Sequence, residues 1–363
     1  MKRILIIFLL MSVLLHWVQA EDVMDEQARR FGVDSLTEGL EDHAKDVMEG
    51  YDPTVQANLI EGVSDILSDA VRQSGSALKA TSALMLKLLG ILLLCRLASG
   101  MEDKRIAAAA SLAGAMAIAA CSFSDLRSMI GLGNETMEQL SGFSTLLLPV
   151  MAASSAASGG AVSSGAVYSA AALFSNLLIR FCRSLLIPLV YGYLALAMTD
   201  SALGTTRLAK LQEMIGWGIK NGLKLVVYSF TGFLTATKLI GSAADAAALK
   251  AAKMTVSSAI PVVGGILSGA ADTLLAGAGL LRSAAGTFGM LAILAIFLLP
   301  FLQMGISYLG FKLAAALGGV LDGGQNRLLE GLTGAMGFML AMVGSCALIC
   351  LYACCCFLRT VTV

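Results

Sequence analysis

The stretch SSAIPVVGGILSGAADTLLAG, residues Ser257–Gly277, combines an apolar run with a proline, four glycines and an acidic residue. Gly265 and Gly269 are four residues apart, a GxxxG spacing that lets two membrane helices approach closely. Pro261 precedes Val-Val-Gly-Gly and predicts a break that leaves two short helices in place of one full span. We therefore interpret Pro261, Gly264, Gly265 and Gly269 as helix-break and packing positions. Because broken helices at membrane depth persist only inside protein or along a cavity, the stretch indicates a transport path or an assembly surface.

The composition of the whole chain indicates a membrane protein. Of its 363 residues, 57% are hydrophobic and only 14% are charged, and the mean hydropathy is +0.80. Soluble domains are typically about 45–50% apolar and about 25% charged. The excess lies in long runs, so we expect an all-α, polytopic membrane protein with about six to eight spans, some of them broken or re-entrant.

The first twenty residues have the pattern of a signal peptide. Lys2 and Arg3 precede an apolar run from Ile4 to Leu15, and small residues stand before an acidic Glu21. An uncleaved first membrane helix is the alternative, although the run is short for a span. In both cases we expect the chain from Glu21 onward to begin outside the cytoplasm.

Charge and periodicity divide the rest into an exported segment, residues 21–80, and a multi-pass domain, residues 81–363. Residues 21–79 hold 14 acidic and 5 basic side chains, whereas residues 80–363 hold 11 acidic and 18 basic ones. Tyr51-Asp52-Pro53 predicts a turn before a helix. That helix has one apolar stripe, formed by Val55, Leu59, Val63, Ile66, Leu67 and Ala70. The stripe can lie on lipid, dock on a partner helix or cover the protein's own helices; its acidic polar face argues against anionic lipid.

The first two spans are predicted at Ala83–Ala98 and Ile106–Phe123, and the positive-inside rule places the bases between them in the cytoplasm. Asp125–Gln139 is expected to be a polar loop. Gly142–Ile179 contains either two closely spaced spans or one span and a re-entrant piece. Further spans are expected at Leu185–Met198, Leu223–Ile240, Phe288–Ile306 with a kink at Pro300, and Met336–Leu358.

Motifs for catalysis, metal binding and cofactor binding are missing from the sequence. The chain has two histidines, His16 and His43, and neither HExxH nor a Walker GxxxxGK[ST] occurs. No basic patch with interleaved aromatics supports nucleic-acid binding. Cys346, Cys350 and Cys354 recur on one helix face, and cysteine in such a setting is more often a small apolar residue than a metal ligand or an acylation site.

Charged residues inside apolar stretches are candidates for function, since they are costly in a membrane. The candidates are Lys87, Lys238, Asp245, Lys250, Lys253, Asp272 and Arg282, and we single out Asp272 and Arg282. Asp272 can face a water-filled path, pair with Arg282 or end a half-helix.

Two stretches of the sequence carry a family resemblance, RSLLIPLVYGYLALA at Arg183–Ala197 and SAIPVVGGILSGAADTLLAG at Ser258–Gly277. Together with the overall pattern of the chain, they resemble the stage III sporulation protein AE family of endospore-forming bacteria. The resemblance implies a non-catalytic subunit, without a cofactor, in the mother-cell membrane that faces the forespore. The complex it implies resembles specialised secretion machines, links the two cells and supports late forespore gene expression.

The partners that the resemblance implies are other mother-cell membrane proteins of the same complex, among them ring-forming subunits, together with a cytoplasmic ATPase and the forespore channel protein. Membrane lipid surrounds such a subunit, and nucleic acid is not among its partners. The alternative function is a secondary transporter or permease with a substrate path at residues 257–277.

Overall fold

The computed structural model describes residues 28–100, 104–158, 168, 171, 173–175, 177–203, 208–233, 264–320 and 326–359. This part of the chain is helical and contains no strand, which confirms the all-α prediction. Five of its helices are long and apolar enough to cross a membrane: Leu59–Ala98, Arg105–Ala157, Leu173–Ala202, Arg282–Val320 and Asn326–Cys355. The chain is therefore a polytopic membrane protein. The predicted signal peptide and Pro261 lie outside the described residues.

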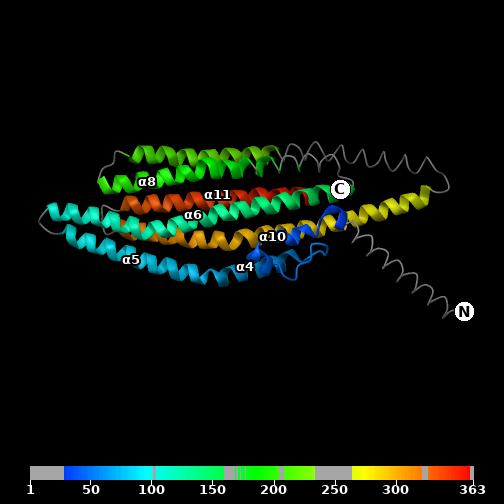
Figure 1. The fold of residues 1–363 in the computed structure, drawn as a ribbon, viewed down its shortest axis with the longest axis horizontal. Coiled ribbons are helices and arrows are strands. Elements are labelled where there is room, and N and C mark those ends of the chain that lie inside the picture. The colour runs from blue at the N-terminus through cyan, green and yellow to red at the C-terminus, as the bar shows by residue number, and fades with distance from the viewer. Residues whose placement is uncertain are drawn as a thin grey trace.

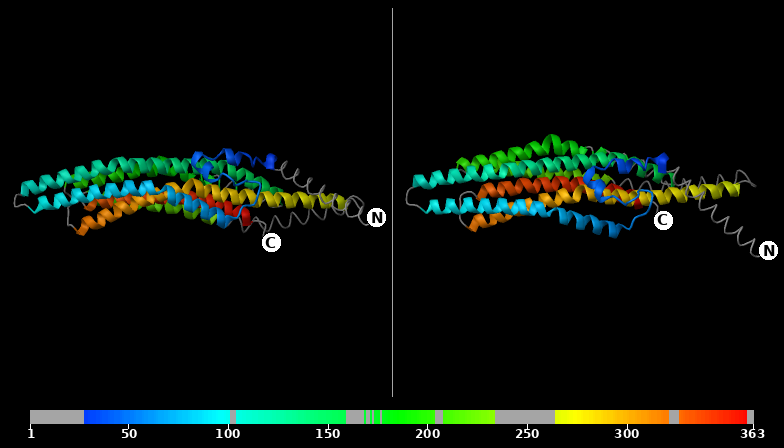
Figure 2. Two further views of the ribbon diagram at one scale, coloured as in Figure 1. Left: turned by 90° about the horizontal axis from the view of Figure 1, so that it is seen from below. Right: turned by 60° about the horizontal axis from the view of Figure 1, so that its bottom comes forward.

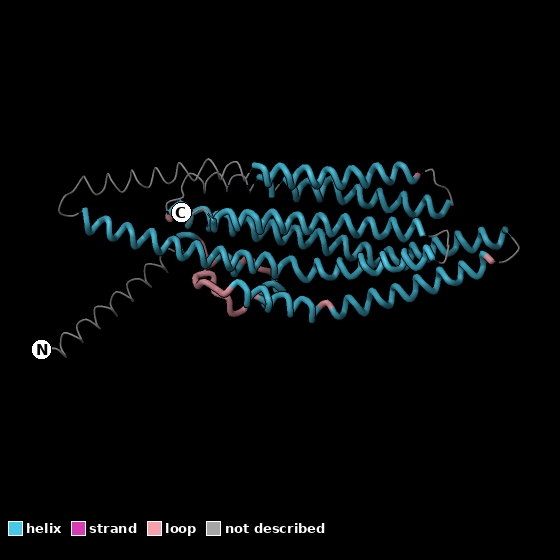
Figure 3. Tube along the Cα trace, turned by 180° about the vertical axis from the view of Figure 1, so that it is seen from behind, coloured by secondary structure: helices cyan, strands magenta, loops and turns pink. Residues whose placement is uncertain are grey.

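The long helices run lengthwise beside one another in an elongated bundle (Figures 1 and 2). The central pair consists of α10 (Gly264–Val320) and α11 (Asn326–Arg359). Around the pair lie α5 (Gly75–Ser99), α6 (Lys104–Ala157) and α8 (Ile187–Leu203), and α8 follows a π-helical turn at Cys182–Leu186. In the most apolar stretches of α10 and α11, 56% of the residues are buried, against 22% in those of the spans Leu59–Ala98 and Arg105–Ala157. The hairpin of α5 and α6 projects past the other helices at one end (Figure 3).

Helix α6 corrects the predicted loop at Asp125–Gln139, because its 54 residues continue without interruption through that stretch. At 1.5 Å per residue the helix is about 80 Å long, far more than the hydrocarbon core of a bilayer. Leu126, Ile130, Met137 and Leu140 recur every three or four residues and are buried in the bundle. Arg127, Ser128 and Glu138 between them are exposed, so the stretch carries charged and polar residues without leaving the helix.

Helix α10 corrects one part of the prediction for Pro261, that a short helix follows this proline; the predicted break itself lies outside the described residues. The helix begins at Gly264 and continues for 57 residues, so the part after Pro261 is the start of a long helix. Pro300 lies inside it and has no N–H to donate to the carbonyl of Ile296. For Gly142–Ile179 the alternatives were two closely spaced spans, or one span and a re-entrant piece. Residues up to Ala157 continue α6. The choice depends largely on residues 159–167, which lie outside the described part.

Glycines allow the helices of the bundle to approach closely. A Cβ at Gly62 would come within 2.7 Å of Leu291, and one at Gly289 within 2.7 Å of Leu147. Small-residue packing of this kind is what the high glycine content of membrane helices provides. These seams join α10 to α6 and to α4 (Leu59–Gln73), the helix that precedes α5.

A buried acid ties three helices together at the end of the bundle near residues 204–207. Asp200, which is 4% exposed, accepts a hydrogen bond of 3.2 Å from the backbone N–H of Leu208. Arg327 Nη1 lies 3.8 Å from the other carboxylate oxygen. Because a buried carboxylate without partners is costly, these contacts fix the ends of α8 and α11 relative to the helix of residues 209–233.

Candidate functional site

The predicted exported segment folds back along the bundle through two short helices, α2 (Ser35–Glu38) and α3 (Asp42–Val47). Five of its apolar side chains are buried against the long helices: Val33, Leu36, Leu40, Ala44 and Met48. Gly39 lies directly on Leu146 of α6, where a larger residue would clash. The segment is therefore part of the folded bundle, with its apolar side chains facing the long helices.

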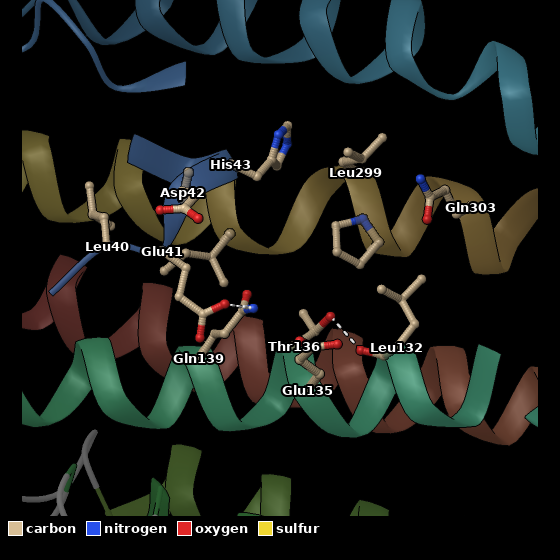
Figure 4. A pocket seen from close by; sticks show the side chains of 13 residues that line it. Leu40, Glu41, Asp42, His43, Leu132, Glu135, Thr136, Gln139, Leu299 and Gln303 are labelled. Carbon is tan, nitrogen blue, oxygen red and sulfur yellow. Dashed lines mark hydrogen bonds between the residues drawn. The ribbon is translucent and has the colours of Figure 1, made fainter. Parts of the chain in front are cut away.

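A cavity of about 630 Å³ lies where this segment crosses α6 and α10 (Figure 4). Glu41 and Gln139 point toward each other there, and the Gln139 amide donates a hydrogen bond to the Glu41 carboxylate. The remaining polar lining consists of Asp42 and His43 from the segment, Glu135 and Thr136 from α6, and Gln303 from α10. The junction between the exported segment and the membrane helices is thus polar and partly hollow.

The cavity lining contains three carboxylates, Glu41, Asp42 and Glu135, and one imidazole, His43. The His43 ring points away from the Glu41–Gln139 pair (Figure 4). Within the described ranges, no group of three His, Cys, Asp or Glu side chains could hold a metal ion. Sequence reasoning registered His43 only as an isolated histidine, because the register that brings α6 and α10 to it is a tertiary property.

The apolar stripe of α4 is divided between two environments. Ile66 and Ala70 are each 2% exposed and pack toward α10, together with Gly62. The other edge of the stripe remains uncovered by the described residues: Ile60 82%, Val71 56%, Leu67 46% and Val63 37% exposed. The alternative that the stripe covers the protein's own helices therefore holds for the edge that packs toward α10. We call the four uncovered residues the α4 ridge.

The predicted turn before α4 is present and is closed by side chains. The backbone N–H of Thr54 donates to Asp52 Oδ1 at 2.8 Å, and the Asn58 side chain caps α4 by accepting from the N–H of Ile60 at 3.2 Å. Tyr51 Oη donates to Asp65 Oδ2 at 2.9 Å, which ties the turn to the helix. Partial burial and the Asp65 carboxylate raise the pKa of Tyr51.

This contact predicts an elevated titration for one of the seven tyrosines. The folded state favours neutral Tyr51, so its stabilising contribution is present below about pH 10 and is lost as pH rises through the raised pKa. The tyrosinate absorbance of the parent minus that of Tyr51→Phe should therefore titrate above pH 10. Asp65→Asn should return the midpoint toward 10, and an unchanged midpoint in that variant would contradict the assignment.

Arg282, one of the two predicted intramembrane charges, is buried in the bundle at 3% exposure. None of its three guanidinium nitrogens has a hydrogen-bond partner among the described residues. Gly133 lies beside Met304 and Leu147 beside Gly289, so the antiparallel register of α6 and α10 places Arg282 level with Ser154 and Ser155. Ser155 Oγ is likewise buried and without a partner within the described ranges. A buried arginine without an anion is costly in a membrane, so Arg282 stays a candidate functional position.

The other predicted site residues lie at or beyond the edge of the described structure. Gly264 is the first residue of α10, and Gly265, Gly269 and Asp272 lie in its first turns, with their side-chain surroundings outside the described part. Asp272 and Arg282 are ten residues apart on one continuous helix, a rise of about 15 Å.

The three cysteines on one face of α11 point into the bundle. Cys346, Cys350 and Cys354 are buried, and the Cys350 Sγ lies 3.0 Å from the Ser144 Oγ of α6. Cys354 Sγ lies 3.7 Å from the carbonyl oxygen of Gly286. These contacts are those of small side chains in a tight helix interface.

The arrangement defines a polytopic helical membrane protein with a docked N-terminal segment and a buried arginine that has no partner among the described residues. Its two larger described cavities lie between packed helices.

The family model described as Stage III sporulation protein AE matches residues 40–360, and the chain belongs to this family. A curated relative from Bacillus subtilis (strain 168), named Stage III sporulation protein AE, is 23% identical over 195 residues. That alignment covers 54% of this chain and 49% of the relative, so the match spans about half the length of the curated relative. No solved structure matches the chain.

Proposed function

We propose that this protein is a non-catalytic membrane subunit of a secretion-like channel complex that links mother cell and forespore. Its role would be in late forespore gene expression, through close helix packing and partner contacts. The family membership over residues 40–360 carries the proposal. The sporulation role follows from that membership, and the complex and its partners extend it.

The charge distribution supports an orientation for this subunit. Arg96, Lys104, Arg105 and Lys210 lie near the same end of the bundle, where α5, α6 and α8 turn (Figure 1). The positive-inside rule assigns that end to the cytoplasm, toward a cytoplasmic ATPase. The acidic N-terminal segment packs farther along the bundle, and we assign it to the intermembrane space, toward ring-forming subunits and the forespore channel protein.

The α4 ridge is the surface that we assign to these extracytoplasmic partners. It is apolar, belongs to the predicted exported segment and is not covered by the described part of this chain. Contiguous exposed apolar surface outside a bilayer commonly marks a protein contact.

The double variant Ile60→Glu/Leu67→Glu tests the assignment, because two charges on the ridge would oppose burial against a partner. We expect the chain to reach the membrane at parental levels while late forespore reporter expression falls and co-purification of the other complex subunits is lost. The matched control is Ser68→Glu/Gln73→Glu, which adds the same charge to exposed positions of the same helix away from the ridge. Normal sporulation in the ridge variant would sink the proposed contact, and sporulation defects of equal size in both variants would show a general effect of charge.

A further inference from the structure

A second cavity, of about 620 Å³, lies between α8, α10, α11 and the helix of residues 209–233. Its wall on α10 and α11 consists largely of small residues, Ala315, Ala316, Gly319, Gly334, Gly337 and Ala341. Tyr193, Tyr308 and Phe338 supply aromatic surface, and a Cβ at Gly334 would lie 2.5 Å from the Tyr193 hydroxyl. The groove exists because glycine and alanine stand where larger side chains would fill it.

Two lysines line this groove from different helices, Lys220 from the helix of residues 209–233 and Lys312 from α10. Lys220 Nζ lies 5.8 Å from the ring centroid of Phe338, and Lys312 Nζ lies 5.5 Å from that of Tyr308. A Cβ at Gly337 would touch the Tyr308 ring at 3.4 Å, so the two rings lie beside consecutive residues of α11. The two cations therefore approach the same level of the groove.

The charge of these lysines is not balanced by an ion pair in the described part of the chain. Within the described ranges, neither ammonium has a carboxylate within ion-pair distance. The single carboxylate of the lining, Glu330, accepts a hydrogen bond of 2.9 Å from the Asn326 amide. Asn326 Oδ1 is buried without a partner in the described part. The groove thus has an excess of positive charge over an apolar floor.

The surroundings of the groove are those of a lipid-facing surface. Trp217, 67% exposed, lies one turn before Lys220, and Leu309 and Leu313 are 63% and 51% exposed on α10 near Lys312. Tryptophan and tyrosine concentrate at the headgroup level of membranes. Basic pockets between membrane helices bind anionic headgroups.

We propose that this groove binds one anionic phospholipid, with the phosphodiester between Lys220 and Lys312 and an acyl chain on the glycine and alanine floor. We assign the groove to a lipid and not to a free anion because its floor is apolar. An acyl chain can cover that floor, whereas a soluble phosphate would leave it without a partner. It is independent of the proposed role in a sporulation complex, since it concerns a contact with the bilayer.

The test compares the purified full-length parent in detergent with Lys220→Gln/Lys312→Gln. The matched control is Lys87→Gln/Lys224→Gln, which removes the same charge from exposed lysines outside the groove. Each protein is titrated with phosphatidylglycerol, phosphatidylcholine or soluble glycerol phosphate, and thermal midpoint and retained lipid by native mass spectrometry are recorded. Equal thermal midpoints in phosphatidylcholine show that the groove variant is folded.

We expect phosphatidylglycerol to raise the midpoint and remain bound in the parent and control, with roughly thirtyfold weaker apparent affinity in the groove variant. Phosphatidylcholine and glycerol phosphate should have no such effect. The proposal is overturned by equal phosphatidylglycerol binding in the groove variant and the parent, or by an equal shift with phosphatidylcholine. A matching shift with glycerol phosphate would replace it with a site for small soluble anions. A groove variant with a lower midpoint in phosphatidylcholine would show a structural role for the lysines and also overturn it.

Discussion

Gly310→Leu is expected to disrupt the packing of α5 on α10. A Cβ at Gly310 would clash with the Thr81 methyl group, and Thr81 also faces Ser307 with 3.5 Å between their hydroxyl oxygens. Overpacking in a tight interface costs about 1–3 kcal/mol, and a leucine at this glycine belongs at the upper end. The thermal midpoint in detergent should fall markedly, and the yield of membrane-inserted protein should fall with it.

Gly305→Leu provides the matched control for this prediction. It lies on the same helix, but no atom comes within 4 Å of a Cβ placed there. The change in intrinsic helix propensity is the same in both variants, so Gly305→Leu should leave the midpoint unchanged or slightly raised. Equal midpoints for the two variants would contradict the proposed close contact.

Arg282→Met is expected to stabilise the protein while impairing sporulation. Methionine retains much of the apolar volume of the side chain and removes a buried charge that has no partner in the described part. Replacing buried ionic groups by apolar residues of similar volume is often stabilising by about 1–4 kcal/mol. An anionic group that binds Arg282 would lose its positively charged partner in this variant, so late forespore reporter expression should fall.

The control for Arg282 is Arg180→Met, which removes an exposed arginine. That variant should change neither the thermal midpoint nor sporulation beyond the small effects typical of surface substitutions. A loss of thermal stability in Arg282→Met would indicate that the guanidinium is satisfied and structural. Normal sporulation in a stabilised variant would show that the buried charge has no function.

The helical class and the membrane assignment could be predicted from local pattern alone, whereas breaks within helices could not. The polar residues of Asp125–Gln139 suggested a loop because a linear reading counts charges and does not separate two helix faces. Leu126 and Ile130, at a four-residue spacing, keep that stretch helical and buried on one side. Pro261 suggested two short helices, but α10 is already continuous from Gly264, three residues later.

Sequence reasoning predicted small-residue packing at Gly265 and Gly269, and the seams that the structure describes lie at other glycines, such as Gly62 and Gly289. A glycine serves as a contact only where a neighbouring helix passes, and the path of that neighbour depends on the register of the whole bundle. The same reason explains why Lys220 and Lys312, ninety-two positions apart in sequence, could not be paired by inspection.

The sequence by itself determined the all-α membrane class and the turn at Tyr51–Pro53, and it singled out Arg282 as a candidate because of its charge in an apolar stretch. These follow from composition, periodicity and the cost of burying charge, which act over one helix or less. Only the tertiary structure decided which edge of α4 is covered, that Arg282 has no partner among the described residues, and that two lysines line one groove. Those properties depend on the relative register of long helices, which is set by side-chain packing summed over many contacts and is not encoded in any single stretch.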